Sequence, residues 1–289
     1  MNARDHIEAH RSAGHVFTAA GVQSFVRREG VGEPVVLMHG VPSSSFLYRK
    51  VLPALARRDV EGVAFDLPGL GLAARPADFD YSWTGLGRFG VDAIDALNID
   101  RFHLVVHDIG GPVGFEMAAA LRDRIRSLTV LNTLIDVDRF HRPWSMHPFS
   151  IGGGIDKLWL ASVRGVMFRM LMRMQGVADA SAMSAAEMDA YVELLKREDG
   201  GAAFLKIMKG FELTAEKRDL YRSTLRDVPY PVQVVWGEDD PALKVDDFGE
   251  IARIAAGLDT VHRLPGKHFF QEEQPDAIAE HVVSLARTS

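Results

Sequence analysis

The stretch that decides the fold runs Leu104-Val105-Val106-His107-Asp108-Ile109-Gly110-Gly111. It begins with a short apolar run of the kind that forms a buried strand, and it ends in paired glycines that let a following helix pack close behind. A strand that turns sharply into a helix presents the residue at the turn on the open end of the sheet. We therefore expect Asp108 at the tip of a strand-to-helix elbow, with Gly110 and Gly111 shaping the turn.

An aspartate at this tip selects a particular chemistry. A serine that displaces a leaving group from a saturated carbon would end as an ether, which water does not readily cleave. A carboxylate ends as an ester, which a base and a water molecule can hydrolyse. The residue type at 108 thus points away from ester and amide substrates and towards attack on sp³ carbon.

Working outward, short apolar segments alternate with helical patterns along most of the chain. An antiparallel pair of strands is predicted within residues 15–28, and single strands at 34–38, 61–66, 102–107, 126–131, 231–236 and 260–264. Helical spacing covers 45–58, 83–97 and 276–287. Continuously apolar strands alternating with helices are typical of a mostly parallel sheet covered on both faces, an α/β fold.

The interval 135–225 interrupts this alternation. It has no convincing strand, and it holds eight of the chain's 11 methionines. Flexible methionines suit an adaptable apolar pocket. We predict an inserted helical lid (cap) at 135–225, between a first core part at 1–134 and a second core part at 226–289.

Two further segments follow predicted strands and complete a chemical set with Asp108. Trp236-Gly237-Glu238-Asp239-Asp240-Pro241 offers an acid, for which we choose Asp240 with Asp239 as the alternative. Lys267-His268-Phe269-Phe270 offers a base, His268. The acid would fix the tautomer of the histidine, and the histidine would draw a proton from water that attacks the Asp108 ester.

A fourth segment supplies main-chain donors. His39-Gly40-Val41-Pro42 follows the strand at 34–38, with His39, Gly40 and Pro42 expected to shape the loop. The backbone N–H groups of Val41 and Ile109 are the candidates for holding an oxyanion when the ester carbonyl becomes tetrahedral. Removing one such donor typically costs about 3–4 kcal/mol of transition-state stabilisation.

At these residues the chain resembles the α/β-hydrolase superfamily, nearest its haloalkane dehalogenase and epoxide hydrolase branch. Nucleophile, acid and histidine occur in that family's order, and the segments at 39–49 and 268–275 are similar to haloalkane dehalogenases. Val106, where serine hydrolases prefer glycine, also fits this branch. The resemblance implies a mostly parallel eight-stranded sheet with helices on both faces, an inserted lid and an aspartate nucleophile.

Two departures from the dehalogenase pattern favour an epoxide. Dehalogenases hold the departing halide with side-chain N–H donors, commonly a tryptophan after the nucleophile or an asparagine after the His-Gly pair, and here these positions are Ile109 and Val41. A halide expelled into an apolar pocket without a donor is poorly stabilised. Trp144 or Trp159 could supply one such donor from the lid.

Epoxide hydrolases instead protonate an alkoxide that stays attached to the product, using lid tyrosines or a histidine. The sequence His107-Asp108-Ile109-Gly110 is similar to one subgroup of them. The candidate lid proton donors here are Tyr221 and Tyr191, with His141 or His147 as alternatives. The leading hypothesis is therefore an epoxide-hydrolase-like enzyme, the second a haloalkane dehalogenase with an altered halide site, and the third a non-catalytic ligand receptor.

Composition sets the remaining limits. The chain has 289 residues, no cysteine, a formal net charge of −6 and 25% charged residues. There is no clustered basic excess for nucleic acid, no apolar stretch of about 18 residues for a membrane span and no metal-ligand spacing. We expect a cytoplasmic enzyme without cofactor or metal, acting on a small apolar substrate and water. The sequence leaves the oligomeric state open.

Overall fold

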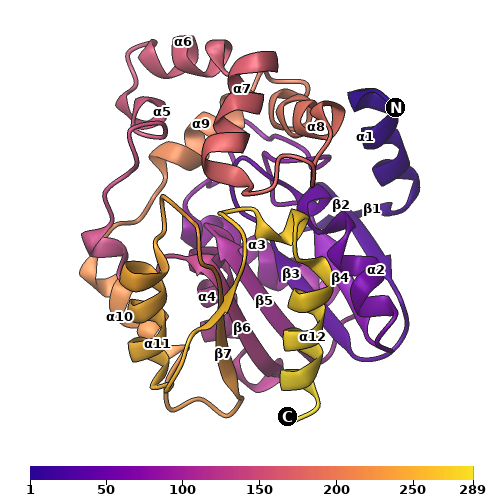
Figure 1. The fold of residues 1–289 in the computed structure, drawn as a ribbon, viewed down its shortest axis with the longest axis vertical. Coiled ribbons are helices and arrows are strands. Elements are labelled where there is room, and N and C mark those ends of the chain that lie inside the picture. The colour runs from indigo at the N-terminus through magenta and orange to yellow at the C-terminus, as the bar shows by residue number, and fades with distance from the viewer. Residues whose placement is uncertain (289) are drawn as a thin grey trace.

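A twisted eight-stranded sheet forms the centre of the molecule in the computed structural model, which describes residues 1–288 (Figure 1). The strands are β1 (His15–Ala19), β2 (Val22–Glu29), β3 (Pro34–Met38), β4 (Glu61–Phe65), β5 (Phe102–Asp108), β6 (Ile125–Thr133), β7 (Val232–Gly237) and β8 (His262–Leu264). They are ordered β1-β2-β4-β3-β5-β6-β7-β8. The β1–β2 and β2–β4 pairs are antiparallel, and the strands from β4 to β8 pair in parallel. The predicted fold class is confirmed.

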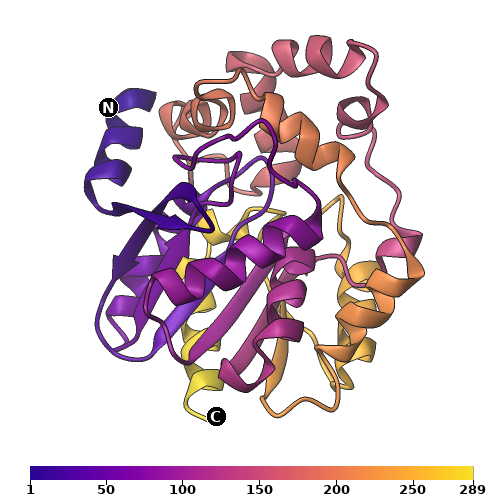
Figure 2. The ribbon, with the colours of Figure 1, turned by 180° about the vertical axis from the view of Figure 1, so that it is seen from behind.

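Helices cover both faces of the sheet. Helices α2 (Val51–Ala56) and α12 (Pro275–Ala286) pack together on one face, and α3 (Trp83–Ala96) and α4 (Gly110–Ala120) on the other (Figures 1 and 2). Helix α11 (Glu250–Ala256) packs against β7. Because both faces are covered, the central strand β5 is buried along its whole length, as its continuous apolar sequence predicts.

Between β6 and β7 the chain is helical. It contains α5 (Pro148–Ile151), α6 (Ile155–Ser162), α7 (Gly165–Leu171), a π-helical turn η4 (Met172–Gly176), α8 (Ala185–Lys196), α9 (Ala202–Lys209) and α10 (Ala215–Ser223). Figure 1 shows α5 to α9 as a layer above one end of the sheet, whereas α10 lies lower, where it packs against α4. We use the word lid for α5 to α9 with their connections, and α10 is structurally part of the core.

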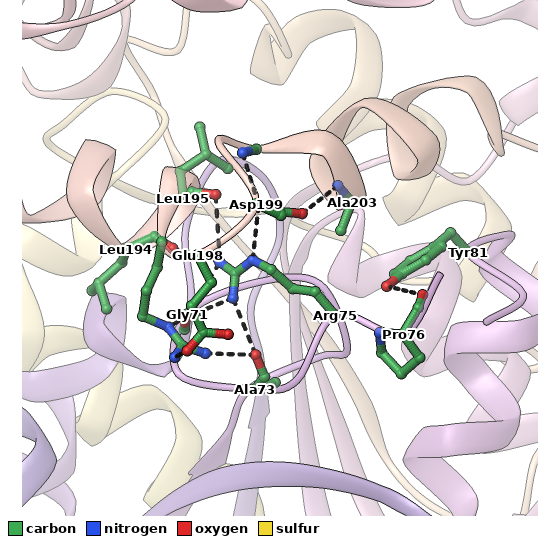
Figure 3. Close-up of polar contacts among 12 residues, drawn as sticks. Gly71, Ala73, Arg75, Pro76, Tyr81, Leu194, Leu195, Glu198, Asp199 and Ala203 are labelled. Carbon is green, nitrogen blue, oxygen red and sulfur yellow. Dashed lines mark hydrogen bonds and ion pairs between the residues drawn. The ribbon is translucent and has the colours of Figure 1, made fainter. Parts of the chain in front are cut away.

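Two arginines fasten the lid to the core through main-chain carbonyls (Figure 3). Arg75, on the loop after β4, donates to the carbonyl of Leu194 at 2.7 Å, near the C-terminal end of α8 where carbonyls lack helical partners. It also pairs with Asp199 at 3.2 Å. In return, Arg197 of the lid donates to the core carbonyl of Ala73 at 2.8 Å. The lid is therefore held by discrete polar contacts in addition to apolar packing.

The N-terminal segment forms a helix that the strand and helix patterns did not reveal. Helix α1 (Ala3–Ser12) begins with a capping box in which Asn2 and Asp5 satisfy each other's backbone N–H. It packs against α8 of the lid (Figure 1). Its buried His10 contacts Phe25, Phe46 and Ser45 of the core. Among the 288 described residues, no helix is both long and apolar enough to span a bilayer.

Candidate active site

Asp108 lies at the tip of a strained elbow between β5 and α4. Its φ of 53° is in the left-handed region, which non-glycine residues rarely adopt and which is common at functional sites. The hydroxyl of Thr133 on β6 donates to its carbonyl. A Cβ on Gly110 would meet the carbonyls of Met38 and His39, so the close approach of helix and strand requires glycine there.

Main-chain N–H groups surround the Asp108 carboxylate, as the sequence predicts. Val41 donates its N–H to Oδ1 at 2.7 Å. The N–H of Ile109 also interacts with this carboxylate and favours its ionised form. Gly40 permits the approach, because a Cβ there would collide with the Asp108 side chain. His39 shapes the loop, since its Nε2 accepts the N–H of Leu67 at 3.0 Å.

His268 lies between the two candidate carboxylates on the loop after β8. Its Nδ1 is 2.7 Å from Asp240 Oδ2, and its Nε2 is 3.4 Å from Asp108 Oδ2. The structure thus brings the three residues Asp108, His268 and Asp240 into one chain of contacts. The adjacent His107 supports the loop, with its Nε2 2.8 Å from the His268 carbonyl.

Asp240 is held rigidly, and Asp239 is not part of this arrangement. Asp240 Oδ1 accepts the N–H groups of Ala242 and Leu243, both at 2.9 Å, and Oδ2 accepts the amide of Asn132 at 2.8 Å. The Asp240 side chain is fully buried, whereas Asp239 is exposed. The choice of Asp240 over Asp239 agrees with this geometry.

The three ionisable groups stabilise each other's charged forms. Burial opposes ionisation of Asp108, but the hydrogen bond and charge of His268 outweigh burial and lower its pKa. The pKa of Asp240 is lowered in the same way, against its burial, by the charge of His268 and by the hydrogen bonds from His268 and Asn132. Burial likewise opposes protonation of His268, yet the charges and hydrogen bonds of both aspartates raise its pKa to about 10.

An apolar cavity of about 130 Å³ opens onto Asp108 and His268. Most of its lining is aliphatic and aromatic, and it comes from both the core and the lid. An enclosed apolar cavity of roughly 150 Å³ is sufficient for a molecule such as benzene. The lining residues include Val41, Pro42 and Ile109 from the core, and Phe149, Phe168 and Phe204 from the lid.

Neither of the two tyrosines predicted as lid proton donors lines this cavity. The hydroxyl of Tyr191 donates to Glu272 Oε1 at 2.5 Å, in a buried cluster that also contains Arg49. Tyr221 lies on α10, stacked near Phe115 of the core helix α4. The reason is the packing of α10: a helix that lies against α4 cannot direct its buried face into the cavity. Burial, followed by nearby acidic groups, raises both phenol pKa values above their usual range.

The other lid candidates also lie away from the cavity. Trp144 is exposed, and the Nε1 of Trp159 donates to the carbonyl of Ser145 at 3.1 Å. His141 and His147 are exposed and do not line the cavity. None of the donors expected from the lid therefore faces Asp108.

Several residues of the site were not anticipated from sequence. Asn132 anchors the acid, and a polar residue near the end of strand β6, next to the acid strand, is a signal that could have identified it. Ser145 and Gln175 are the uncharged polar side chains among the cavity-lining residues. No sequence motif surrounds either of them. Within the described part of the chain, no cluster of three or more histidine or acidic residues is arranged to hold a metal ion.

Comparison with known proteins agrees with this architecture. The family model described as "Alpha/beta hydrolase family" matches residues 35–281. The chain therefore belongs to the α/β-hydrolase family, and it is a hydrolase.

The similar proteins include both a haloalkane dehalogenase and an epoxide hydrolase. The chain is 29% identical over 269 residues to haloalkane dehalogenase 2 of Mycobacterium tuberculosis, covering 88% of each chain. It is 27% identical over 279 residues to an uncharacterised hydrolase of Saccharomyces cerevisiae, covering 92% of this chain and 93% of that one. In three dimensions it is similar to an epoxide hydrolase of Vigna radiata, with a TM-score of 0.76 at 21% identity, covering 96% and 98%. The structural likeness at this identity concerns the fold alone.

Proposed function

We propose that this hydrolase cleaves a bond at a saturated carbon of a small apolar substrate through a covalent ester on Asp108. The observation that carries the proposal is the contact chain from Asp240 through His268 to Asp108, which opens onto an apolar cavity. A carboxylate nucleophile, a histidine base and an acid that orients the base are the parts that this chemistry needs.

The reaction proceeds in two steps. In the first, an Asp108 carboxylate oxygen forms a bond to the substrate carbon, and the leaving group departs with the bonding electron pair. In the second, His268 removes a proton from water as the water oxygen attacks the carbonyl carbon of the ester. The N–H groups of Val41 and Ile109 hold the resulting oxyanion. The C–O bond to the product then breaks, and His268 returns the proton to the departing alkoxide. Asp108 is left as a carboxylic acid, and it becomes a carboxylate again when it passes its proton through His268 to solvent.

Esterification of Asp108 also prepares His268 for the second step. The charge of Asp108 and its hydrogen bond are two of the four contributions that raise the pKa of His268. An ester carries no charge, so both contributions weaken once the substrate is attached. The pKa of His268 then falls from about 10 towards the range in which the imidazole is neutral and can act as a base.

Two substrate classes suit this chemistry, epoxides and haloalkanes. The sequence placed epoxides first because Tyr221 was available as a proton donor and the usual halide donors are replaced at Val41 and Ile109. With Tyr221 packed on α4 and Tyr191 bonded to Glu272, that preference loses its expected proton donors, whereas the absence of the usual halide donors at Val41 and Ile109 still stands. We keep the proposal at the level of the Asp108 ester, with both classes as substrates to be tested.

The experiment is to trap the ester. The variant His268→Gln is incubated with a bromoalkane or with an epoxide of the same carbon chain, and intact-mass spectrometry is followed by peptide mapping. We expect an adduct on Asp108, absent from the double variant Asp108→Asn/His268→Gln. A single turnover of the unchanged protein in oxygen-18 water should place the heavy oxygen in Asp108 and leave the first product molecule unlabelled.

Two results would contradict the proposed ester on Asp108. No adduct with either class, together with no turnover by the unchanged protein, would overturn the proposal and leave the cavity as that of a ligand receptor. Heavy oxygen in the product of the first turnover, with none in Asp108, would indicate direct attack of water on the substrate.

A further inference from the structure

Apart from Asp108 and His268, the residues with polar side chains among those that line the cavity are Ser145 and Gln175. Both lie between β6 and β7, in the part of the chain that contains the lid. The remaining lining side chains are aliphatic, aromatic or thioether groups. A leaving group expelled from the substrate into this cavity would meet these two residues as its polar surroundings.

Gln175 is positioned by the loop that carries the histidine. It lies in η4 (Met172–Gly176), a π-helical turn in which the N–H of Val177 bonds to the carbonyl of Met172 at 2.9 Å. The carbonyl of Gln175 accepts the N–H of His268 at 3.4 Å, and the carbonyl of Gly176 accepts that of Phe269 at 2.7 Å. The π-turn is thus paired through its backbone with the His268 loop. Such turns frequently occur at functional sites.

Ser145 fixes which end of the Gln175 amide is free. The Ser145 hydroxyl donates to Gln175 Oε1 at 3.2 Å. Ser145 is itself held, because Trp159 Nε1 donates to its carbonyl at 3.1 Å. With its oxygen occupied, the amide has its NH₂ group left, and no residue from 1 to 288 accepts a hydrogen bond from it. A residue that lines the cavity thus carries an amide NH₂ group without a partner among residues 1–288.

We propose that the Gln175 amide is the donor that receives the leaving group, and that it selects leaving groups which depart as weakly basic anions, such as halides. This inference rests on the proposed Asp108 ester. An amide N–H donates a hydrogen bond but does not transfer its proton near neutral pH. A halide needs only the hydrogen bond, whereas an epoxide oxygen becomes a strongly basic alkoxide that needs a proton as the ring opens.

With a haloalkane as substrate, the first step expels a halide ion. An oxygen of Asp108 forms the C–O bond, the carbon–halogen bond breaks, and the halide keeps the electron pair. The halide accepts a hydrogen bond from Gln175 Nε2. The N–H groups of Val41 and Ile109 are instead directed at Asp108, and the Ser145 hydroxyl donates to Gln175. In the overall reaction, haloalkane and water give alcohol, halide ion and a proton, which the His268 pathway releases to solvent.

The decisive variant is Gln175→Met, which keeps the length of the side chain and removes the donor. It is made in the His268→Gln background, and the rate of adduct formation is measured with a bromoalkane, a chloroalkane and an epoxide of one carbon chain. We expect alkylation by the haloalkanes to slow by about 100-fold, a typical loss for removal of one preorganised donor. Chloride, the poorer leaving group, should lose more than bromide. Ser145→Ala, which frees the amide to rotate, should give a smaller loss in the same order.

A matched control lies two residues away on the same turn. Arg173 is exposed and its side chain makes no contact with the cavity, so Arg173→Met tests for a general disturbance of the π-turn. We expect adduct formation in this variant to match that of His268→Gln alone.

Failure of this inference can be distinguished from failure of the Asp108 ester. Adducts that form in His268→Gln and at the same rate in Gln175→Met/His268→Gln would remove the role of Gln175 and leave the ester intact. An epoxide that alkylates faster than the bromoalkane would likewise overturn the inference. No adduct in His268→Gln itself would instead contradict the proposed function.

Discussion

In the core, Asp108, Asp240 and His268 lie at or after the carboxyl ends of the parallel strands β5, β7 and β8, whereas in the lid the cavity is lined from several helices. Hydrogen bonds between strands fix the register of the sheet, so residues at the carboxyl ends of β5, β7 and β8 must meet at one edge. Helices in the lid have no such shared register. Strand order therefore predicts which core residues meet at the site. It does not predict which lid residues face the leaving group.

The two regions also differ in how each polar group is held. Asp240 receives two main-chain N–H groups and two side-chain donors, which fix both of its oxygens. In the lid, the Gln175 side chain has one hydrogen-bond partner among residues 1–288, Ser145. The core residues of the site are therefore held rigidly, whereas the lid residues are held by few contacts. Such a site can keep the same nucleophile while a few substitutions in the lid change which leaving group it accepts.

The largest expected effect tests the core half of this comparison. In Asp240→Asn the residue at 240 keeps its shape, but the carboxylate that orients His268 and stabilises its charged form is lost. We expect turnover to fall by roughly 10³- to 10⁴-fold, the scale seen when the acid of such a triad becomes an amide. The step affected should be hydrolysis of the ester, so adduct should accumulate on Asp108 during turnover.

The neighbouring carboxylate supplies the matched control. Asp239 is exposed, and its side chain accepts a long hydrogen bond from the N–H of Gly266 at 3.4 Å. Asp239→Asn should leave turnover nearly unchanged. Equal losses in the two variants would mean that strand order does not single out Asp240, and the contrast between core and lid would lose its main support.

The sequence predicts the position of Asp108 but not which lid residues face the cavity. The elbow at Asp108 was predictable because an apolar run followed by two glycines allows few conformations. Tyr221 was expected in the lid because its helix falls within the interval 135–225, yet α10 packs against the core helix α4. Nothing in the local pattern of a helix states which neighbour its apolar face will cover. Gln175 could not be found because a single polar residue in an apolar lid carries no periodic signal.

An intermediate effect is expected from Tyr191, one of the two tyrosines that the sequence analysis names as candidate proton donors. Tyr191→Phe removes a buried hydrogen bond to Glu272, whose side chain also pairs with Arg49 and Lys50. We expect a loss of about 2–3 kcal/mol in the free energy of unfolding, because a hydrogen bond to a buried charged group is lost. The measurement is urea unfolding, together with adduct formation in the His268→Gln background.

Neither tyrosine should alter the rate of alkylation, since neither lines the cavity. Tyr221→Phe serves as the companion variant on α10, outside the lid layer. A large loss of epoxide alkylation in either variant, with stability unchanged, would restore the tyrosines as proton donors. Epoxides would then be favoured over haloalkanes as substrates, as the sequence alone predicts.

The smallest effect concerns α1, which contacts lid and core together. His10 is buried between the rings of Phe25 and Phe46, and its Nε2 is 2.9 Å from the hydroxyl of Ser45. Burial, and then the charges of Arg27 and Arg49, lower its pKa from 6.5 to about 3. The folded protein thus holds this histidine neutral. The free energy of unfolding is therefore not reduced by His10 above pH 6.5, and it decreases as the pH falls from 6.5 towards 3, because the unfolded chain binds a proton there.

At pH 5.5 the unfolded chain binds this proton and the folded chain does not. One pH unit below 6.5 corresponds to about 1.4 kcal/mol. His10→Gln keeps a polar partner for Ser45 but does not titrate, so its loss of unfolding free energy between pH 7.5 and 5.5 should be about 1.4 kcal/mol smaller than that of the unchanged protein. Ser12→Ala, a change at an exposed position without a titrating group on the same helix, should follow the unchanged protein. Equal losses with and without His10 would show that α1 is not docked through this histidine, and that it belongs with the adjustable lid rather than the core.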